Sequence, residues 1–145
     1  MLNSIGFKTT LKLLATPVYF QAMGDQSTRA QIGISGWTQD YPHPLDWFDI
    51  LLNGEHITST HNNNYANADV PAINRKIDEL KREPTLTPRV NREWAALDRE
   101  VMKQAFWAPL VNRVGEDFFG PDIDTSCYVP HAVYGFVWGS ICKKQ

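Results

Sequence analysis

Residues 29–48 read RAQIGISGWTQDYPHPLDWF, and this stretch decides which fold class we expect. Residues 29–37 are rich in residues that suit an extended chain, which predicts a strand. Two prolines stiffen residues 40–44 into a turn. Residues 45–52 place their apolar side chains on one helical face. A strand, a rigid turn and a helix in direct succession predict a layered α/β domain.

The rest of the chain repeats this alternation. Further strands are expected at residues 6–15, 108–114 and 134–141, and a short helix at residues 17–23. Two longer helices follow a polar loop, and Asp69 and Thr87 can cap them. Their apolar stripes recur at helical spacing, with Val70, Ile73, Ile77 and Leu80 in the first and Val90, Trp94, Leu97 and Val101 in the second.

Composition excludes some classes of function. The chain has 145 residues and a formal net charge of −2, so it offers no basic face for nucleic acid. No apolar run approaches the roughly 20 residues that span a bilayer. Residues 1–4 lack the basic region of a signal peptide, and a strand-like run follows at once. We therefore expect either a cytosolic chain or a piece of a larger exported protein, and the strand-like start favours the second.

The two cysteines, Cys127 and Cys142, are close in sequence and belong to no CxxC motif. This spacing suits a disulfide that closes a short terminal loop, and such a bond implies an oxidising compartment. Two unrelated buried thiols are the alternative.

Signatures of catalysis are missing. The chain has no GxSxG, GxxxxGK[ST], HExxH or GxGxxG motif. The pair His56 and His61 matches no standard metal spacing, so surface imidazoles are the simpler interpretation. We expect Asp46 and Asp49 to occupy the exposed face of their short helix. No cofactor is expected.

One constellation suits ligand binding. Trp37, Asp40 and Tyr41 follow the predicted strand at its carboxyl end, where ligands gather in α/β sheets. A carboxylate beside an indole face suits an ammonium group, through a charge-assisted hydrogen bond and cation–π attraction. The alternative is structural: Trp37 packs and Asp40 caps the turn.

These residues resemble the family 5 extracellular solute-binding proteins, which deliver peptides, nickel complexes and other solutes to ABC importers. The resemblance is densest in residues 29–48, where Gly36-Trp37 precedes Asp40-Tyr41 and a proline turn. It continues through residues 64–67 (NYAN), 92–94 (REW), 108–110 (APL) and 133–135 (VYG).

The resemblance implies one lobe of a type II periplasmic-binding-protein fold, a mixed sheet flanked by helices. Residues 1–113 would form the second lobe, and residues 114–145 a segment that returns to a first lobe. Asp40 would pair with a peptide's α-amino group. The backbone around Gly36, Trp37 and Thr38 would pair with the ligand main chain, and Trp37 and Tyr41 would line the pocket.

It also implies partners and a location: a peptide or similar small solute, an ABC permease, and an extracytoplasmic site for the parent protein. Two other functions stay open. One is a small standalone α/β enzyme that acts on an amine-bearing substrate near Asp40. The other is an interaction module that uses exposed aromatic side chains.

Overall fold

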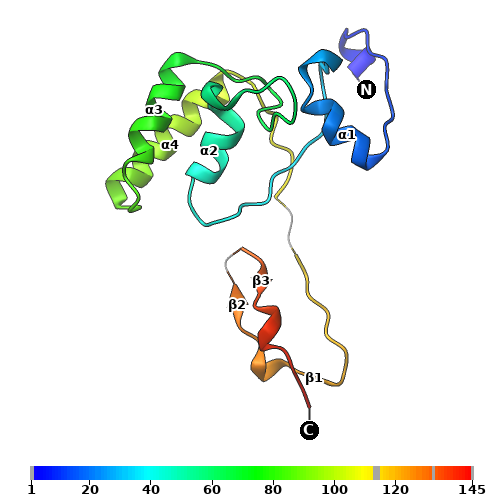
Figure 1. The fold of residues 1–145 in the computed structure, drawn as a ribbon, viewed down its shortest axis with the longest axis vertical. Coiled ribbons are helices and arrows are strands. Elements are labelled where there is room, and N and C mark those ends of the chain that lie inside the picture. Colours follow the sequence, from blue (N-terminus) through cyan, green and yellow to red (C-terminus); the bar gives the residue numbers. More distant parts are fainter. Residues whose placement is uncertain (1, 113–114, 132, 145) are drawn as a thin grey trace.

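The computed structural model describes residues 2–112, 115–131 and 133–144. Its helices are α1 (Thr16–Met23), α2 (Leu45–Leu52), α3 (Pro71–Lys81) and α4 (Pro88–Lys103). Figure 1 shows α2, α3 and α4 packed together, with α1 to one side and the C-terminal strands apart from them. Among the described residues no helix is long and apolar enough to cross a membrane.

The helix boundaries follow local signals. Helix α2 spans the predicted residues, and α1 begins one residue before the expected start, with proline in its first turn. The Thr87 hydroxyl accepts a hydrogen bond from the Val90 amide at 3.2 Å and caps α4 as predicted. The predicted cap of α3 is wrong. Val70 is the N-cap, and the Asp69 carboxylate instead accepts from Asn74 Nδ2 at 2.8 Å.

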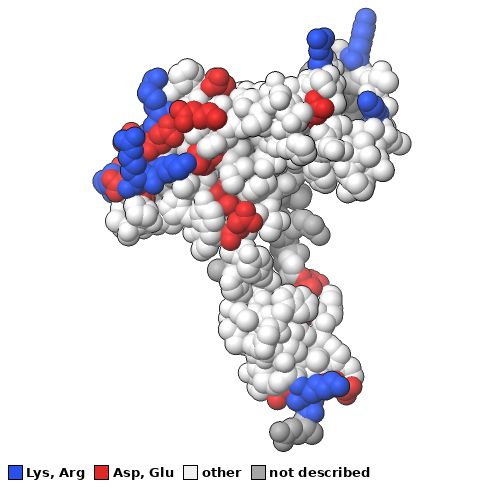
Figure 2. Space-filling model, viewed as in Figure 1, with Lys and Arg blue, Asp and Glu red and all other residues white. Residues whose placement is uncertain are grey.

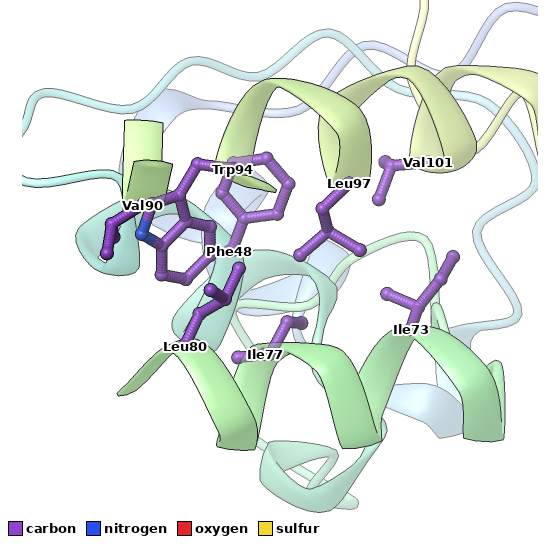
Figure 3. Packing of buried hydrophobic residues seen from close by; sticks show 8 residues of the cluster. All are labelled: Phe48, Ile73, Ile77, Leu80, Val90, Trp94, Leu97 and Val101. Atoms are coloured by element: carbon purple, nitrogen blue, oxygen red, sulfur yellow. The ribbon is translucent and has the colours of Figure 1, made fainter. Parts of the chain in front are cut away.

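The hydrophobic core lies between α2, α3 and α4. Its buried members are Phe48, Ile73, Ile77, Leu80, Val90, Trp94, Leu97 and Val101, and Figure 3 shows them converging from the facing helices. Both predicted stripes supply this core, except for the half-buried Val70. Each aliphatic side chain buried in this way stabilises the fold by roughly 1.5–3 kcal/mol.

The loop before α3 is fastened by asparagine side chains rather than by apolar packing. Asn64 is completely buried; its Nδ2 donates to the Ala68 carbonyl at 2.9 Å and to the Asn53 carbonyl at 3.3 Å. Its Oδ1 accepts from the Ala68 amide at 2.8 Å. Since buried amides are costly when unpaired, these bonds let a polar loop close over the end of α2.

Helix α1 joins the rest of the chain through the same loop. The Gly24 carbonyl accepts from the Asn62 amide at 2.9 Å, and the Gln26 amide donates to the Ser59 carbonyl at 3.0 Å. A Cβ at position 24 would lie 2.9 Å from the Asn62 carbonyl oxygen. Glycine is therefore required where these two backbones meet.

The strands differ from the sequence prediction. Residues 6–15 and 29–37 belong to no ladder within the described part of the chain, and residues 108–112 are likewise unpaired. Most of their apolar side chains face solvent, with Leu11 and Leu13 82% and 84% exposed. A β-strand needs a second strand hydrogen-bonded to it, and the described residues provide no such strand for these segments.

The observed strands are short and lie near the C-terminus. β1 (Ile123–Asp124) pairs antiparallel with β4 (Cys142–Lys143), and β2 (Pro130–His131) with β3 (Gly135–Phe136). Only β3 represents the strand predicted at residues 134–141. The boundary predicted between residues 113 and 114 lies outside the described residues.

A disulfide and an aromatic cluster hold this C-terminal segment together. Cys127 is bonded to Cys142, with their Cα atoms 5.9 Å apart. The Phe136 ring is buried, and its centroid lies 5.5 Å from that of Tyr128 and 5.6 Å from that of Phe119. The segment thus has a small core of its own, built from rings rather than aliphatic side chains.

Candidate functional site

The candidate site is the turn that leads from residue 36 into α2. The His43 amide donates to the Tyr41 carbonyl at 2.8 Å, and the Asp46 amide donates to the His43 carbonyl at 3.1 Å. The His43 Nδ1 atom accepts from the Leu45 amide at 3.1 Å. These local bonds, with the two prolines, fix the path of the backbone at the start of the helix.

Asp46 holds the turn through hydrogen bonds to its side chain. Its side chain is completely buried in the first turn of α2. Its Oδ2 atom accepts from the indole Nε1 of Trp37 at 3.0 Å and from the Asp40 amide at 3.0 Å. A carboxylate at a helix N-terminus is also favoured by the helix dipole. Asp46 therefore connects the helix start to two separate points of the turn.

The predicted ligand residues are left open by this arrangement. Asp40 is exposed, and its carboxylate makes no hydrogen bond or ion pair with any described residue. Thr38 is exposed beside it. A Cβ built on Gly36 would meet no atom within 4 Å, so the backbone there can be approached closely. The structural alternative for Asp40, a side-chain cap of the turn, is not what the structure shows.

Tyr41 lies in a negatively charged setting. Partial burial raises the pKa of its hydroxyl, and the nearby carboxylates of Asp46 and Asp49 raise that pKa further. The ring remains partly exposed, with its centroid 6.5 Å from that of His43. Negative charge beside an aromatic ring suits a cationic group on a ligand.

His43 joins the turn to the helical core. The edge of its ring meets Trp94, with 5.9 Å between the ring centroids. Its Nε2 atom is buried, and no described residue forms a hydrogen bond with it. With Nδ1 accepting from an amide, Nε2 holds the proton in the neutral ring. His43 thus acts here mainly through packing.

The acidic residues of α2 correct the sequence analysis. Asp46 and Asp49 were expected on an exposed face, but both are buried. Asp49 Oδ1 accepts from Asn53 Nδ2 at 3.0 Å and contacts His56 Nε2 at 3.1 Å. Its Oδ2 accepts from Lys81 at 2.6 Å. For Asp49, the sequence did contain a signal of burial. Asp49 follows Leu45 by four residues, so the two side chains lie on the same face of the helix.

The side chains that could bind a metal ion already take part in other bonds or contacts. Among the described residues, Asp124, Cys127 and Cys142 are the group whose ligand atoms come close enough for an ion. Since the two sulfurs are bonded to each other, they cannot act as thiolate ligands. In the loop that contains His56 and His61, His56 Nε2 contacts Asp49 Oδ1.

Two surface hollows lie away from the turn. One has a volume of about 440 Å³ and is bordered by residues 3–10 near the N-terminus. The other, of about 280 Å³, lies between α1 and the loop around His61. Neither is lined by Trp37, Asp40 or Tyr41.

The charge distribution agrees with the low net charge. On the face drawn in Figure 2, basic and acidic side chains intermingle over α3 and α4. Lys76 lies 2.8 Å from Glu93 Oε2 and 2.9 Å from Glu79 Oε1, for example. Such interleaved charges form solvated ion pairs rather than a surface for phosphates.

Comparison with known proteins now adds to this geometry. No protein-family model matches the chain, and no curated protein matches it either. Among solved structures it is similar to "Clavulanic acid biosynthesis oligopeptide binding protein 2", with a TM-score of 0.83 and 26% sequence identity. The match covers 99% of this chain. The chain has the fold of a solute-binding protein lobe.

The α/β fold class is thereby confirmed, with the helices described above and small antiparallel ladders. The chain spans only 27% of the length of that neighbour. By its name, the neighbour is an oligopeptide-binding protein. Its likeness to this chain agrees with a binding role rather than a catalytic one.

Proposed function

We propose that this chain is the ligand-binding lobe of an extracytoplasmic solute-binding protein that serves an ABC importer. Its solute is a peptide or a similar small molecule with a free ammonium group. The observation that carries the proposal is how the turn is held: Asp46 binds Trp37 and the Asp40 backbone, while the Asp40 carboxylate stays exposed and has no partner among the described residues. The structural neighbour is named as an oligopeptide-binding protein, which supports the choice of solute.

In this proposal Asp40 pairs with the α-ammonium of a peptide. A charge-assisted hydrogen bond of this kind is about twice as strong as a neutral one. In the complex we propose, the ring of Trp37 lies next to the ligand's ammonium group and adds cation–π attraction. Tyr41 lines the same side of the ligand. The open backbone at Gly36 and Thr38 pairs with the peptide main chain, in the manner of strand addition.

The exposed extended segments support a larger assembly. Residues 6–15 and 29–37 present apolar side chains to solvent, including Ile34 at 78% exposure. Since unpaired apolar strands are unfavourable alone, we propose that further chain of the parent protein pairs with them. Residues 1–113 then form one lobe, and residues 114–145 contact the rest of the protein.

The disulfide supports the proposed location. Bonds such as Cys127–Cys142 persist in oxidising compartments, which include the periplasm and the cell surface. Delivery to an ABC permease from that side of the membrane would follow. An enzyme acting on an amine near Asp40 has less support, because the nearby His43 has one nitrogen occupied and the other buried.

The proposal is tested by titrating the chain with trialanine and with N-acetyl-trialanine, followed by amide NMR. We expect trialanine to shift the signals of residues 36–41, with an affinity on the order of 1 mM because only one side of a cleft is present. The acetylated peptide lacks the ammonium group, so it should bind more weakly. Equal shifts from both peptides, or none in residues 36–41, would contradict the proposal.

A further inference from the structure

We infer that Asp46 is the positioning residue of the ligand-binding turn: it sets the orientation of Trp37 and Asp40 without touching the ligand itself. This inference rests on the proposed function. The helix face that was expected to be solvated instead holds a fully buried carboxylate, and one oxygen of that carboxylate binds both parts of the turn.

One of the two hydrogen bonds holds a side chain of the turn, and the other holds its backbone. The bond from Trp37 Nε1 ties a side chain to Asp46, because the indole N–H can only donate and Asp46 Oδ2 is its acceptor. The bond from the Asp40 amide fixes the backbone from which the Asp40 carboxylate projects. Both meet at Asp46 Oδ2, so the indole of Trp37 and the Asp40 backbone share one acceptor.

The choice of aspartate at this position has a cost that packing alone does not explain. Asp46 Oδ1 is buried and has no hydrogen-bond partner among the described residues. An unpartnered buried carboxylate oxygen is unfavourable. The carboxylate strengthens the two hydrogen bonds of the turn, because hydrogen bonds to an ionised acceptor are stronger than those to a neutral one. A turn that must hold its shape before the ligand arrives benefits from that strength.

Asp49 provides the contrast within the same helix. It is also buried, but its two oxygens are occupied by Asn53, His56 and Lys81, none of which belongs to the turn. Asp49 therefore joins α2 to α3, whereas Asp46 joins α2 to the ligand-binding turn. The two buried acids are three residues apart, but they connect α2 to different parts of the structure.

The test compares Asp46→Ala and Asp46→Asn with the unaltered chain by hydrogen exchange in NMR. Trp37→Phe assigns the Trp37 indole signal. In Asp46→Ala we expect exchange of the Trp37 indole N–H and the Asp40 amide to accelerate together, on the order of tenfold. Asp46→Asn keeps a neutral acceptor oxygen and should restore part of the protection. The amides of α3 and α4 should be unchanged in both variants.

Two outcomes would overturn the inference: unchanged exchange at Trp37 and Asp40, or faster exchange spread equally over α3 and α4. The second would mean that Asp46 serves only the fold. If Asp46→Ala does not fold, Asp46→Asn decides by the same signals.

Trialanine titration of the same variants separates this inference from the proposed function. If the unaltered chain does not bind trialanine, the proposed function fails, while hydrogen exchange still decides whether Asp46 holds the turn. If the unaltered chain binds and Asp46→Asn binds with equal affinity despite faster exchange, the positioning role is wrong.

Discussion

The Lys81 ammonium lies 2.6 Å from Asp49 Oδ2 and ties the last turn of α3 to the middle of α2. Burial alone would raise the pKa of Asp49, but hydrogen bonds from Lys81 and Asn53 hold it below its ordinary value of 3.8. The same ion pair raises the pKa of Lys81 above its ordinary 10.5. This contact links the elements that position the candidate site.

The first prediction concerns the pH dependence of this link. Because folding lowers the pKa of Asp49, its contribution is present above pH 3.8 and is lost as the pH falls through the lower folded value. Because folding raises the pKa of Lys81, its contribution is complete below pH 10.5 and is lost as the pH rises further. Lys81→Met should therefore destabilise the chain between these limits, and the deficit should shrink outside them.

The size of that deficit should be modest. The Lys81 side chain is 46% exposed, so solvent screens the pair and we expect a loss of up to about 1 kcal/mol. Urea unfolding of both chains at several pH values measures it. Lys12→Met is the matched control, because Lys12 is exposed and has no ion pair among the described residues. A constant difference from pH 2 to pH 12 would contradict the role given to this ion pair.

The second prediction tests the core. Ile77 is completely buried between α2, α3 and α4, so Ile77→Ala should reduce the free energy of unfolding by about 2–5 kcal/mol. Met102→Ala changes a 42% exposed side chain on α4 and should cost no more than about 0.5 kcal/mol. Similar losses in the two variants, measured by urea unfolding, would show that the core is placed wrongly.

The third prediction tests the start of α4. Thr87→Ala removes the hydroxyl that accepts from the Val90 amide and should cost about 1 kcal/mol. Thr87→Ser keeps a hydroxyl and should recover most of that loss. Thermal unfolding followed by circular dichroism compares the two. If serine is no better than alanine, the cap is not what stabilises this helix end.

The fourth prediction concerns the disulfide. Cys127 and Cys142 are 15 residues apart, and closing a loop of that length contributes roughly 3 kcal/mol in the chain-entropy model. Reduction should therefore loosen the β1–β4 ladder, while the α2–α4 core stays folded. Hydrogen exchange with and without reductant measures both parts. Loss of the helical signal on reduction would contradict this separation.

The sequence predicted the helices well because their signals are local. Thr87 with its following proline and the two apolar stripes depend only on neighbours along the chain. The segments at residues 6–15 and 29–37 were harder, because a ladder depends on a partner that local pattern does not reveal. Their alternation was visible, but their pairing was not.

The candidate site was only partly predictable. Pattern and resemblance pointed to Trp37, Asp40 and Tyr41, and the structure brings Trp37 and Asp40 together on Asp46. Asp46 itself was missed because an acid beside tryptophan on a short helix looks solvated. Its burial depends on the turn folding back over the helix start, which is a tertiary event. The Asp49 pairing with Lys81 was hidden for the same reason.

The fifth prediction bears on the central claim, that Asp40 receives a ligand ammonium group. Asp40→Asn removes the charge but keeps the shape of the side chain, and its carboxylate has no partner among the described residues whose loss could unfold the chain. Asp98→Asn, an exposed acid on α4, is the control with the same change in net charge.

The decisive measurement is the affinity of trialanine for these three chains, determined by NMR titration of residues 36–41. We predict that Asp40→Asn weakens binding about tenfold or more, as expected for a lost charge-assisted hydrogen bond, while Asp98→Asn matches the unaltered chain. Unchanged affinity in Asp40→Asn would show that this carboxylate does not hold the ligand.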